Sequence, residues 1–351
     1  MPNLRHDPVN DQWVAIAKNR QERPMEFIPL EQTRQQMICP FCKRNEEETP
    51  KTIVAYRGDG TTLTDADDPT SWTVRVVPNK YPSFANEKGW QTSVVLPSSV
   101  PNPGVPPQDI DRPWGFRTTE SIGVQELIIP SPRHITTISE LQRNELLLSF
   151  RAYQDRLKKL SQLDYIKHAM LFMNCRLAAG ASLGHIHTQL IGSPVISGQL
   201  GRRVERNTKH FAQHGCSLID SVARWEMSEE VRLVKQTENF VVVCPFASRF
   251  AFQVWMIPLR QRADFLTCPA EMRDELAEHC QALIRTMESA LDGPAYNLLL
   301  HLDPFGAAQP GQWYLEIFPR LTRAAGFEWG TDIWVNPVPP SVAARQLRVQ
   351  D

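Results

Sequence analysis

The stretch "IKHAMLFMNCRLAAGASLGHIHTQLI", residues 166–191, decides which fold the sequence predicts. It holds two apolar runs typical of adjacent strands, joined by a loop of small residues. A similar order returns in "AYNLLLHLDPFGAAQPGQWYLEIF", residues 295–318. A pattern that occurs twice in one chain indicates an internal duplication.

The segments that precede these two stretches also repeat in the same order. "SWTVRVVPNKYPSF" (71–84) matches "NFVVVCPFASRF" (239–250), and "GVQELIIPSPRH" (123–134) matches "FQVWMIPLRQRADF" (252–265). A long helix follows in each copy, with Ser139 as the expected N-cap of the first and residues 269–291 as the second. This order predicts an α+β fold of two tandem units, each an antiparallel sheet with a long helix.

The duplication also sets the expected boundaries. We expect an N-terminal unit over residues 1–195, a connection over 196–235 and a C-terminal unit over 236–351.

The composition excludes several classes of protein. The 351 residues include 38 basic and 39 acidic side chains, so the net charge is −1 and no global field attracts nucleic acid or a membrane. There is no run of 18 apolar residues, and the N-terminus lacks the pattern of a signal peptide. The seven cysteines are scattered apart from Cys39 and Cys42. We therefore expect a cytoplasmic protein without a nucleic-acid or membrane partner.

The duplication provides an internal control for the histidines. When "QLIG" (189–192) is aligned with "EIFP" (316–319), the second copy has no histidine at the positions of interest. Tyr314 aligns with His187, Glu316 with Gln189, Gln312 with His185 and Arg262 with His134. The strands persist without these histidines, so the fold does not require them. The pattern favours a chemical role in the first copy and a degenerate second copy.

The motif Cys39-Pro40-Phe41-Cys42 indicates either half of a metal site or a redox dithiol. A tetrahedral zinc site would need two further ligands, and His134 and His185 are the candidates.

His187 is then left for chemistry. In a strand, His185, His187 and Gln189 point to one face because side chains alternate. A neutral imidazole is a good nucleophile toward phosphorus, which suits two-step nucleotidyl transfer. Gln189 and Ser182 could donate hydrogen bonds to the developing charge.

With these motifs in place, the sequence resembles galactose-1-phosphate uridylyltransferase and its relatives in the histidine-triad superfamily. The resemblance spans nearly the whole chain and rests on a combination of motifs: "NDQWVAIAKNRQERP", "CPFC", "RVVPNKYPSF", "SPRH" and "FMN…GASLGHIHTQ".

The resemblance implies two tandem histidine-triad-like units and a nucleotidyl-histidine intermediate at His187, with Gln189 assisting. It implies one structural zinc at Cys39, Cys42, His134 and His185. It implies nucleotide contacts from Arg20, Arg23, Asn79, Asn174, Ser182 and Gln189. The expected partners are a nucleotide sugar and a sugar phosphate or phosphate, and a homodimer is compatible with the resemblance.

The sequence departs from the family pattern in three places. Arg176 stands where a glycine is usual in the loop after Asn174. A second metal site would need a cysteine at Ile219 as the partner of Cys216, so we expect one metal. The stretch "AAGFEWGTDIWVNP" (324–337) lacks the lysine that grips a hexose 1-phosphate, and Asp332 would repel that phosphate if it faced the site. This stretch is more similar to the ADP-glucose phosphorylase branch.

The main hypothesis is therefore uridylyl transfer from a UDP-glucose-type donor to a hexose 1-phosphate, as in galactose metabolism. An ADP-glucose phosphorylase-type transfer of adenylyl to inorganic phosphate is the alternative. A hydrolase of nucleotide conjugates differs only in using water as the acceptor. A zinc-stabilised binding module would show a basic patch with interleaved aromatics, which the near-neutral charge disfavours.

Overall fold

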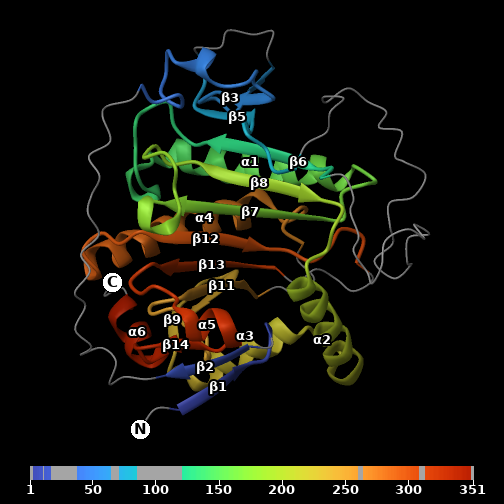
Figure 1. Ribbon diagram of the computed structural model, residues 1–351, viewed down its shortest axis with the longest axis vertical. Helices are drawn as coiled ribbons and strands as arrows, with labels where there is room; N and C mark the ends of the chain where they lie inside the picture. The colour runs from blue at the N-terminus through green and yellow to red at the C-terminus, as the bar shows by residue number, and fades with distance from the viewer. Residues whose placement is uncertain are drawn as a thin grey trace.

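The computed structural model describes residues 3–10, 12–16, 38–64, 71–84, 121–259, 264–307 and 313–348. Within these residues, one antiparallel sheet of eleven strands dominates a mixed α/β fold. The strand order is β4-β3-β5-β6-β8-β7-β12-β13-β11-β10-β9 (Figure 1). The two predicted halves therefore join edge to edge through β7 and β12.

The first half has the strands β3 (Val54–Tyr56), β4 (Thr62–Leu63), β5 (Val74–Pro78), β6 (Val124–Ile129), β7 (His168–Cys175) and β8 (Thr188–Ser193). The last four fall where the apolar runs predict strands, whereas the sequence did not predict β3 and β4. β5 ends at Pro78, as the sequence predicts, because a proline cannot donate to the ladder. β8 begins at Thr188, so His185 and His187 lie in the segment that leads into the strand.

The second half has the strands β9 (Leu233–Gln236), β10 (Phe240–Val243), β11 (Val254–Pro258), β12 (Tyr296–His301) and β13 (Tyr314–Pro319). Counted outward from the β7–β12 seam, β8, β6 and β5 on one side mirror β13, β11 and β10 on the other. Phe172 pairs with Gln189, and Leu299 pairs with Glu316. The two central hairpins therefore have the register that the sequence alignment predicts.

Two long helices cover one face of the sheet, α1 (Arg143–Ser161) and α4 (Ala270–Ala290), seen behind the strands in Figure 1. The helices contact each other, and their buried side chains belong to one core that runs across both halves. Apolar residues at helical spacing, such as Leu146, Leu157, Leu276 and Ile284, form the buried stripes.

The predicted start of the first helix is wrong. Ser139 lies in a separate 3-10 turn, Ile138–Glu140, whose N-cap is Thr137. The backbone is extended at Leu141, and α1 begins after Gln142. The Glu145 carboxylate accepts a hydrogen bond from the Gln142 N–H at 2.8 Å, which caps the helix.

The opposite face of the second half is covered by α3 (Leu218–Glu229) and by a small sheet of β1 (Asn3–Asp7), β2 (Gln12–Ile16) and β14 (Trp334–Asn336). Val9 and Ile219 pack there against Val241 and Trp255. The first strands of the chain thus lie beside its C-terminal half (Figure 1).

The remaining helices are α2 (Gly198–His214), α5 (Gly326–Thr331) and α6 (Pro340–Leu347). In the part of the chain that the structure describes, no helix combines the length and apolarity that crossing a membrane requires.

A buried ion pair joins α1 to β6. Arg156 donates from Nε and Nη2 to the Glu126 carboxylate, each at 2.8 Å, and both residues are buried. We expect Arg156→Met to lower the free energy of unfolding by about 3–5 kcal/mol, because it leaves a buried carboxylate unpaired. Urea denaturation measures this loss. Arg143→Met breaks an exposed pair with Glu278 and should cost less than about 1 kcal/mol, so equal losses in both variants would contradict the expectation.

Candidate functional site

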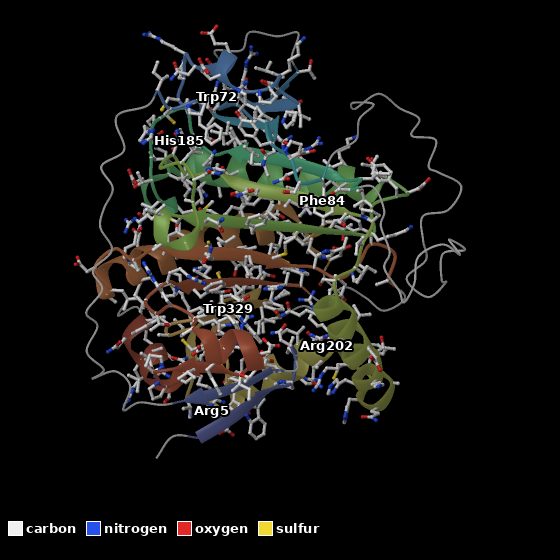
Figure 2. All side chains as sticks on the ribbon, viewed as in Figure 1. Arg5, Trp72, Phe84, His185, Arg202 and Trp329 are labelled. Carbon is white, nitrogen blue, oxygen red and sulfur yellow. The ribbon has the colours of Figure 1, made fainter. Side chains whose placement is uncertain are left out.

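Four side chains from distant parts of the chain converge at one end of the sheet. The sulfurs of Cys39 and Cys42 and one ring nitrogen each of His134 and His185 lie within 4.8 Å of one another. His185 is labelled in Figure 2 near the edge of the first half. The sequence-predicted ligand set is thus brought together.

The geometry of this cluster fits a tetrahedral metal site. Cys39 Sγ and Cys42 Sγ lie 3.5 and 3.6 Å from His185 Nδ1, and Cys42 Sγ lies 3.4 Å from His134 Nδ1. Zinc–sulfur and zinc–nitrogen bonds of ordinary length in a tetrahedron place S and N about 3.6 Å apart. Two thiols and two imidazoles are also a donor set that zinc commonly uses.

Surrounding hydrogen bonds orient these donors. His185 Nε2 donates to the Ser131 carbonyl at 3.1 Å, which leaves the lone pair of Nδ1 toward the sulfurs. The backbone N–H of Lys43 donates to the Pro132 carbonyl at 3.0 Å, and Asn45 Nδ2 donates to the Cys39 carbonyl at 2.8 Å. The cysteine loop is therefore tied to the segment that carries His134.

Burial shifts two of the cluster's groups. It lowers the pKa of His185 to about 4, with a further contribution from His134. Burial and the adjacent Cys39 raise the pKa of the Cys42 thiol to about 11.

Phe41 links the cluster to His187. Its ring is buried and makes edge contacts with His185 at 5.9 Å and with His187 at 5.1 Å between centroids. Both imidazoles therefore contact the same ring, although neither histidine lies within β8, where the alternation had placed them.

The tautomer of His187 is set by the backbone. Its Nδ1 donates to the His185 carbonyl at 3.0 Å, so the neutral ring carries its lone pair on Nε2. Burial lowers the pKa of His187, which favours the neutral form. The side chain is buried in the segment just before β8.

The loop between β7 and β8 lies next to His187. The β7–β8 ladder extends to the pair Met173 and Thr188, so Asn174 and His187 occupy the following rung. Asn174 and Gln189 are half-buried and Ser182 is exposed. These three predicted nucleotide contacts therefore come from the two strands and the loop that frame His187.

Arg176 keeps the loop in a conformation that usually needs glycine. Its φ is 69° and its ψ is 164°, a region that only glycine adopts without strain. Its guanidinium lies 3.7 Å from the Glu288 carboxylate of α4. Arg176 thus occupies, with backbone strain, the position where the family usually has a glycine, and Glu288 of α4 holds its side chain from outside the loop.

Asn79, another predicted nucleotide contact, is not brought together with this group. The strand registers place Asn79 level with Ile191, four residues along the strands from His187, or about 13 Å. Its Oδ1 accepts from the Tyr81 N–H at 2.8 Å. Arg20, Arg23, Arg262 and Gln312 lie outside the described residues.

The equivalent positions of the second half are packed into a buried network of aromatic and charged side chains. Tyr314 is buried, stacks on His301 at 4.4 Å and contacts Trp255 at 4.8 Å. Glu316 accepts from His301 Nε2 at 2.7 Å and from Arg249 Nη2 at 3.3 Å. Although burial opposes it, the Arg249 charge lowers the pKa of Glu316 to about 2. The positions that carry His187 and Gln189 in the first half are thus occupied here by side chains that contact one another.

The segment 326–334 does not reach this site within one chain. α5 and β14 lie over the C-terminal half, and Figure 2 shows Trp329 well separated from His185. Asp332 accepts a hydrogen bond from the Trp334 indole N–H at 3.2 Å and does not face the site.

Three residues of this site were not predicted from the sequence. Phe41 is visible as the apolar residue inside the cysteine motif, whereas Ser131 acts through its carbonyl and leaves no signal. Asn297 donates to Asn174 from β12. Its signal is one polar residue within an apolar strand, "YNLLLH".

Comparisons with known proteins identify a family and similar proteins for this chain. Residues 137–350 match the family described as "Domain of unknown function (DUF4921)". An ADP-glucose phosphorylase of Arabidopsis thaliana is 27% identical, over 99% of this chain and 92% of its own. A galactose-1-phosphate uridylyltransferase of Thermotoga maritima is 25% identical, over 99% and 98%. The crystal structure of an Arabidopsis thaliana ADP-glucose phosphorylase with bound ADP-glucose superposes with a TM-score of 0.79 at 25% identity, covering 100% of both chains.

Proposed function

Since the chain belongs to the DUF4921 family and is a nucleotidyltransferase of the galactose-1-phosphate uridylyltransferase and ADP-glucose phosphorylase type, we propose that it transfers a nucleoside monophosphate from a nucleotide sugar through His187. The observation that carries this proposal is the anchored ring of His187, whose Nδ1 is held by the His185 carbonyl. Its Nε2 lone pair is then available as a nucleophile.

The reaction has two steps at one phosphorus. His187 Nε2 attacks the α-phosphorus of the nucleotide sugar, the bond from that phosphorus to the bridging oxygen breaks, and the sugar phosphate leaves. An acceptor oxygen then attacks the same phosphorus, the P–N bond breaks and the electron pair returns to Nε2. Asn174, Ser182 and Gln189 donate hydrogen bonds to the phosphoryl oxygens, whose charge rises in both steps.

The metal that we propose is one structural zinc held by Cys39, Cys42, His134 and His185. Bound there, zinc contributes free energy to folding, because the ligands come from segments that the chain must first bring together. The cluster supports His187 indirectly, through Phe41 and through the carbonyl of the ligand His185.

The architecture that we propose consists of two tandem histidine-triad-like units, residues 1–195 and 236–351, with 196–235 as the connection, except that β1 and β2 pack on the second unit and β9 begins within the connection. The mirrored strand order and the shared hairpin register support it. The second unit is degenerate, since Tyr314 and Glu316 replace the nucleophile and Gln189. We also propose a cytoplasmic location, and a homodimer would be compatible with this assignment.

For the acceptor, we favour inorganic phosphate with ADP-glucose as the donor. The relative at 27% identity is an ADP-glucose phosphorylase, and residues 324–337 contain no lysine to neutralise a hexose phosphate. Uridylyl transfer to a hexose 1-phosphate is the second candidate, supported by the uridylyltransferase that aligns over 99% of this chain.

The zinc assignment predicts that Cys42→Ser lowers metal content and melting temperature together, because binding free energy is folding free energy. Elemental analysis of the wild type should give about one zinc per chain. Cys216→Ser changes a buried thiol outside the cluster and should retain the metal. Full zinc occupancy and unchanged melting in Cys42→Ser would rule the assignment out.

The acceptor assignment predicts faster turnover of ADP-glucose with phosphate than of UDP-glucose with galactose 1-phosphate. Both pairs are incubated with the enzyme, and the nucleotide products are identified by chromatography. Equal or better turnover with galactose 1-phosphate would reverse the preference that we propose.

The nucleophile assignment predicts that wild type, mixed with nucleotide sugar alone, gains the mass of one nucleoside monophosphate. The linkage should be acid-labile and base-stable, as phosphorus–nitrogen bonds are. His187→Gly should fold, keep its zinc and lose turnover by many orders of magnitude, since a covalent nucleophile is removed. Intact-protein mass spectrometry measures the adduct.

The control for this experiment is His210→Gln, a change on α2 that should leave the adduct intact. An adduct of the same mass on His187→Gly would show that another group is the nucleophile. So would a wild type that turns over without ever carrying the adduct.

A further inference from the structure

We propose that Asn297, in the C-terminal half, is a positioning residue for nucleotidyl transfer at His187. It holds the Asn174 amide with its N–H groups toward the reacting phosphate and fixes the loop that carries Ser182. This inference rests on the proposed function and adds to it a residue that lies across the seam between the two halves.

Both protons of the Asn297 amide nitrogen are donated in hydrogen bonds. Its Nδ2 donates to Asn174 Oδ1 at 2.8 Å and to the Ala179 carbonyl at 2.9 Å. Asn297 and Asn174 are direct partners in the β12–β7 pair, and Asn297 is 8% exposed. The amide is thus built into the sheet and lies beneath the loop.

The first bond decides which way the Asn174 amide faces. Because Asn297 presents a donor, the Asn174 oxygen must face it and the Asn174 nitrogen must face away. That nitrogen lies beside the loop, 3.6 Å from the place where a Cβ on Gly180 would stand. Asn174 therefore offers N–H donors next to His187, which suits an anionic phosphate. The reversed amide would present an oxygen and repel it.

The second bond fixes the loop itself. The Ala179 carbonyl belongs to a short 3-10 turn, Leu177–Ala179, that ends at Gly180 with a φ of 94°. The N–H groups of Ala179 and Ala181 both donate to the Arg176 carbonyl, at 3.1 and 3.2 Å. Asn297 thus ties this compact turn, one residue before Ser182, to a strand of the other half.

The location of Asn297 also argues for a specific role. In β12, Asn297 is a polar residue in an otherwise apolar strand interior, since three leucines follow it. A buried amide stabilises only when its hydrogen bonds are made, and here its donors go to one candidate site residue and to the loop that frames the site.

The experiment uses Asn297→Asp in the zinc-containing full chain. The carboxylate has the same shape but can only accept, so it should draw the Asn174 nitrogen toward itself and turn the Asn174 oxygen toward the phosphate. Single-turnover formation of the nucleotidyl adduct from ADP-glucose, and in turn from UDP-glucose, should slow by about 10- to 100-fold. Asn297→Ala, which removes both bonds without adding charge, should slow it too and serves if the first variant does not fold.

A double-mutant cycle separates positioning from general damage. In an Asn174→Ala background there is no Asn174 amide to orient and only the bond to the Ala179 carbonyl remains to be lost, so Asn297→Asp should slow adduct formation by clearly less than it does in the wild-type background. The matched control is Gln281→Glu on α4. Gln281 is also buried and donates from one amide nitrogen to two carbonyls, of Ile138 at 3.0 Å and Leu141 at 2.8 Å. It should lower the melting temperature and leave the rate of adduct formation unchanged.

The outcomes distinguish this inference from the proposed function. If wild type forms no adduct, the proposed function fails and this inference falls with it. If wild type forms the adduct and both Asn297 variants form it at the wild-type rate, the inference alone is overturned. An equal slowing by Asn297→Asp with and without Asn174 would also overturn it, because the effect would not pass through the amide.

Discussion

The pairing of β7 with β12 is the constraint on which the rest of the structure depends. Five residue pairs, from Leu171 with Leu300 to Cys175 with Tyr296, join the two halves into one continuous sheet. Because the sheet is continuous, α1 and α4 share one hydrophobic core on its helical face. The other face then differs between the halves: α3 and the first strands cover one, and the cysteine loop and His187 occupy the other. Asn174 and Asn297 meet across the same seam, so the pairing that builds the core also reaches the candidate site.

The asymmetry between the halves has a physical basis in what each position touches. His187 lies against the Phe41 ring, and its Nδ1 donates to the His185 carbonyl. Tyr314, at the equivalent position, is held between Trp255 and His301, while Glu316 is neutralised by Arg249. One half therefore keeps the proposed nucleophile beside a loop of small residues. In the other half the same positions belong to a buried network of aromatic and charged side chains.

The cluster of Cys39, Cys42, His134 and His185 bears on how the cysteine segment is attached to the sheet. The segment with Cys39 and Cys42 packs on the sheet through a small apolar group that includes Phe41, Trp72 and Leu127. A metal shared with His134 and His185 would add a strong link between that segment and the strand that leads to His187. The same residues that stabilise the N-terminal loop thus also determine where the imidazole of His187 lies.

Much of this could be predicted from the sequence, because the signals are local. Alternating and helical periodicity set the order of strands and long helices, and the duplication set the register of the two hairpins. The residue types alone indicated Cys39, Cys42, His134 and His185 as candidate ligands and left His187 for chemistry.

Only the tertiary structure decided the features that depend on contacts between distant segments of the chain. Hydrogen bonds to the carbonyls of Ser131 and His185 set the tautomers of the two imidazoles. The extended backbone at Leu141 makes α1 begin after Ser139. Asn297 orients Asn174 only because two strands more than a hundred residues apart pair side by side, and a linear pattern carries no record of which way an amide faces across such a pair.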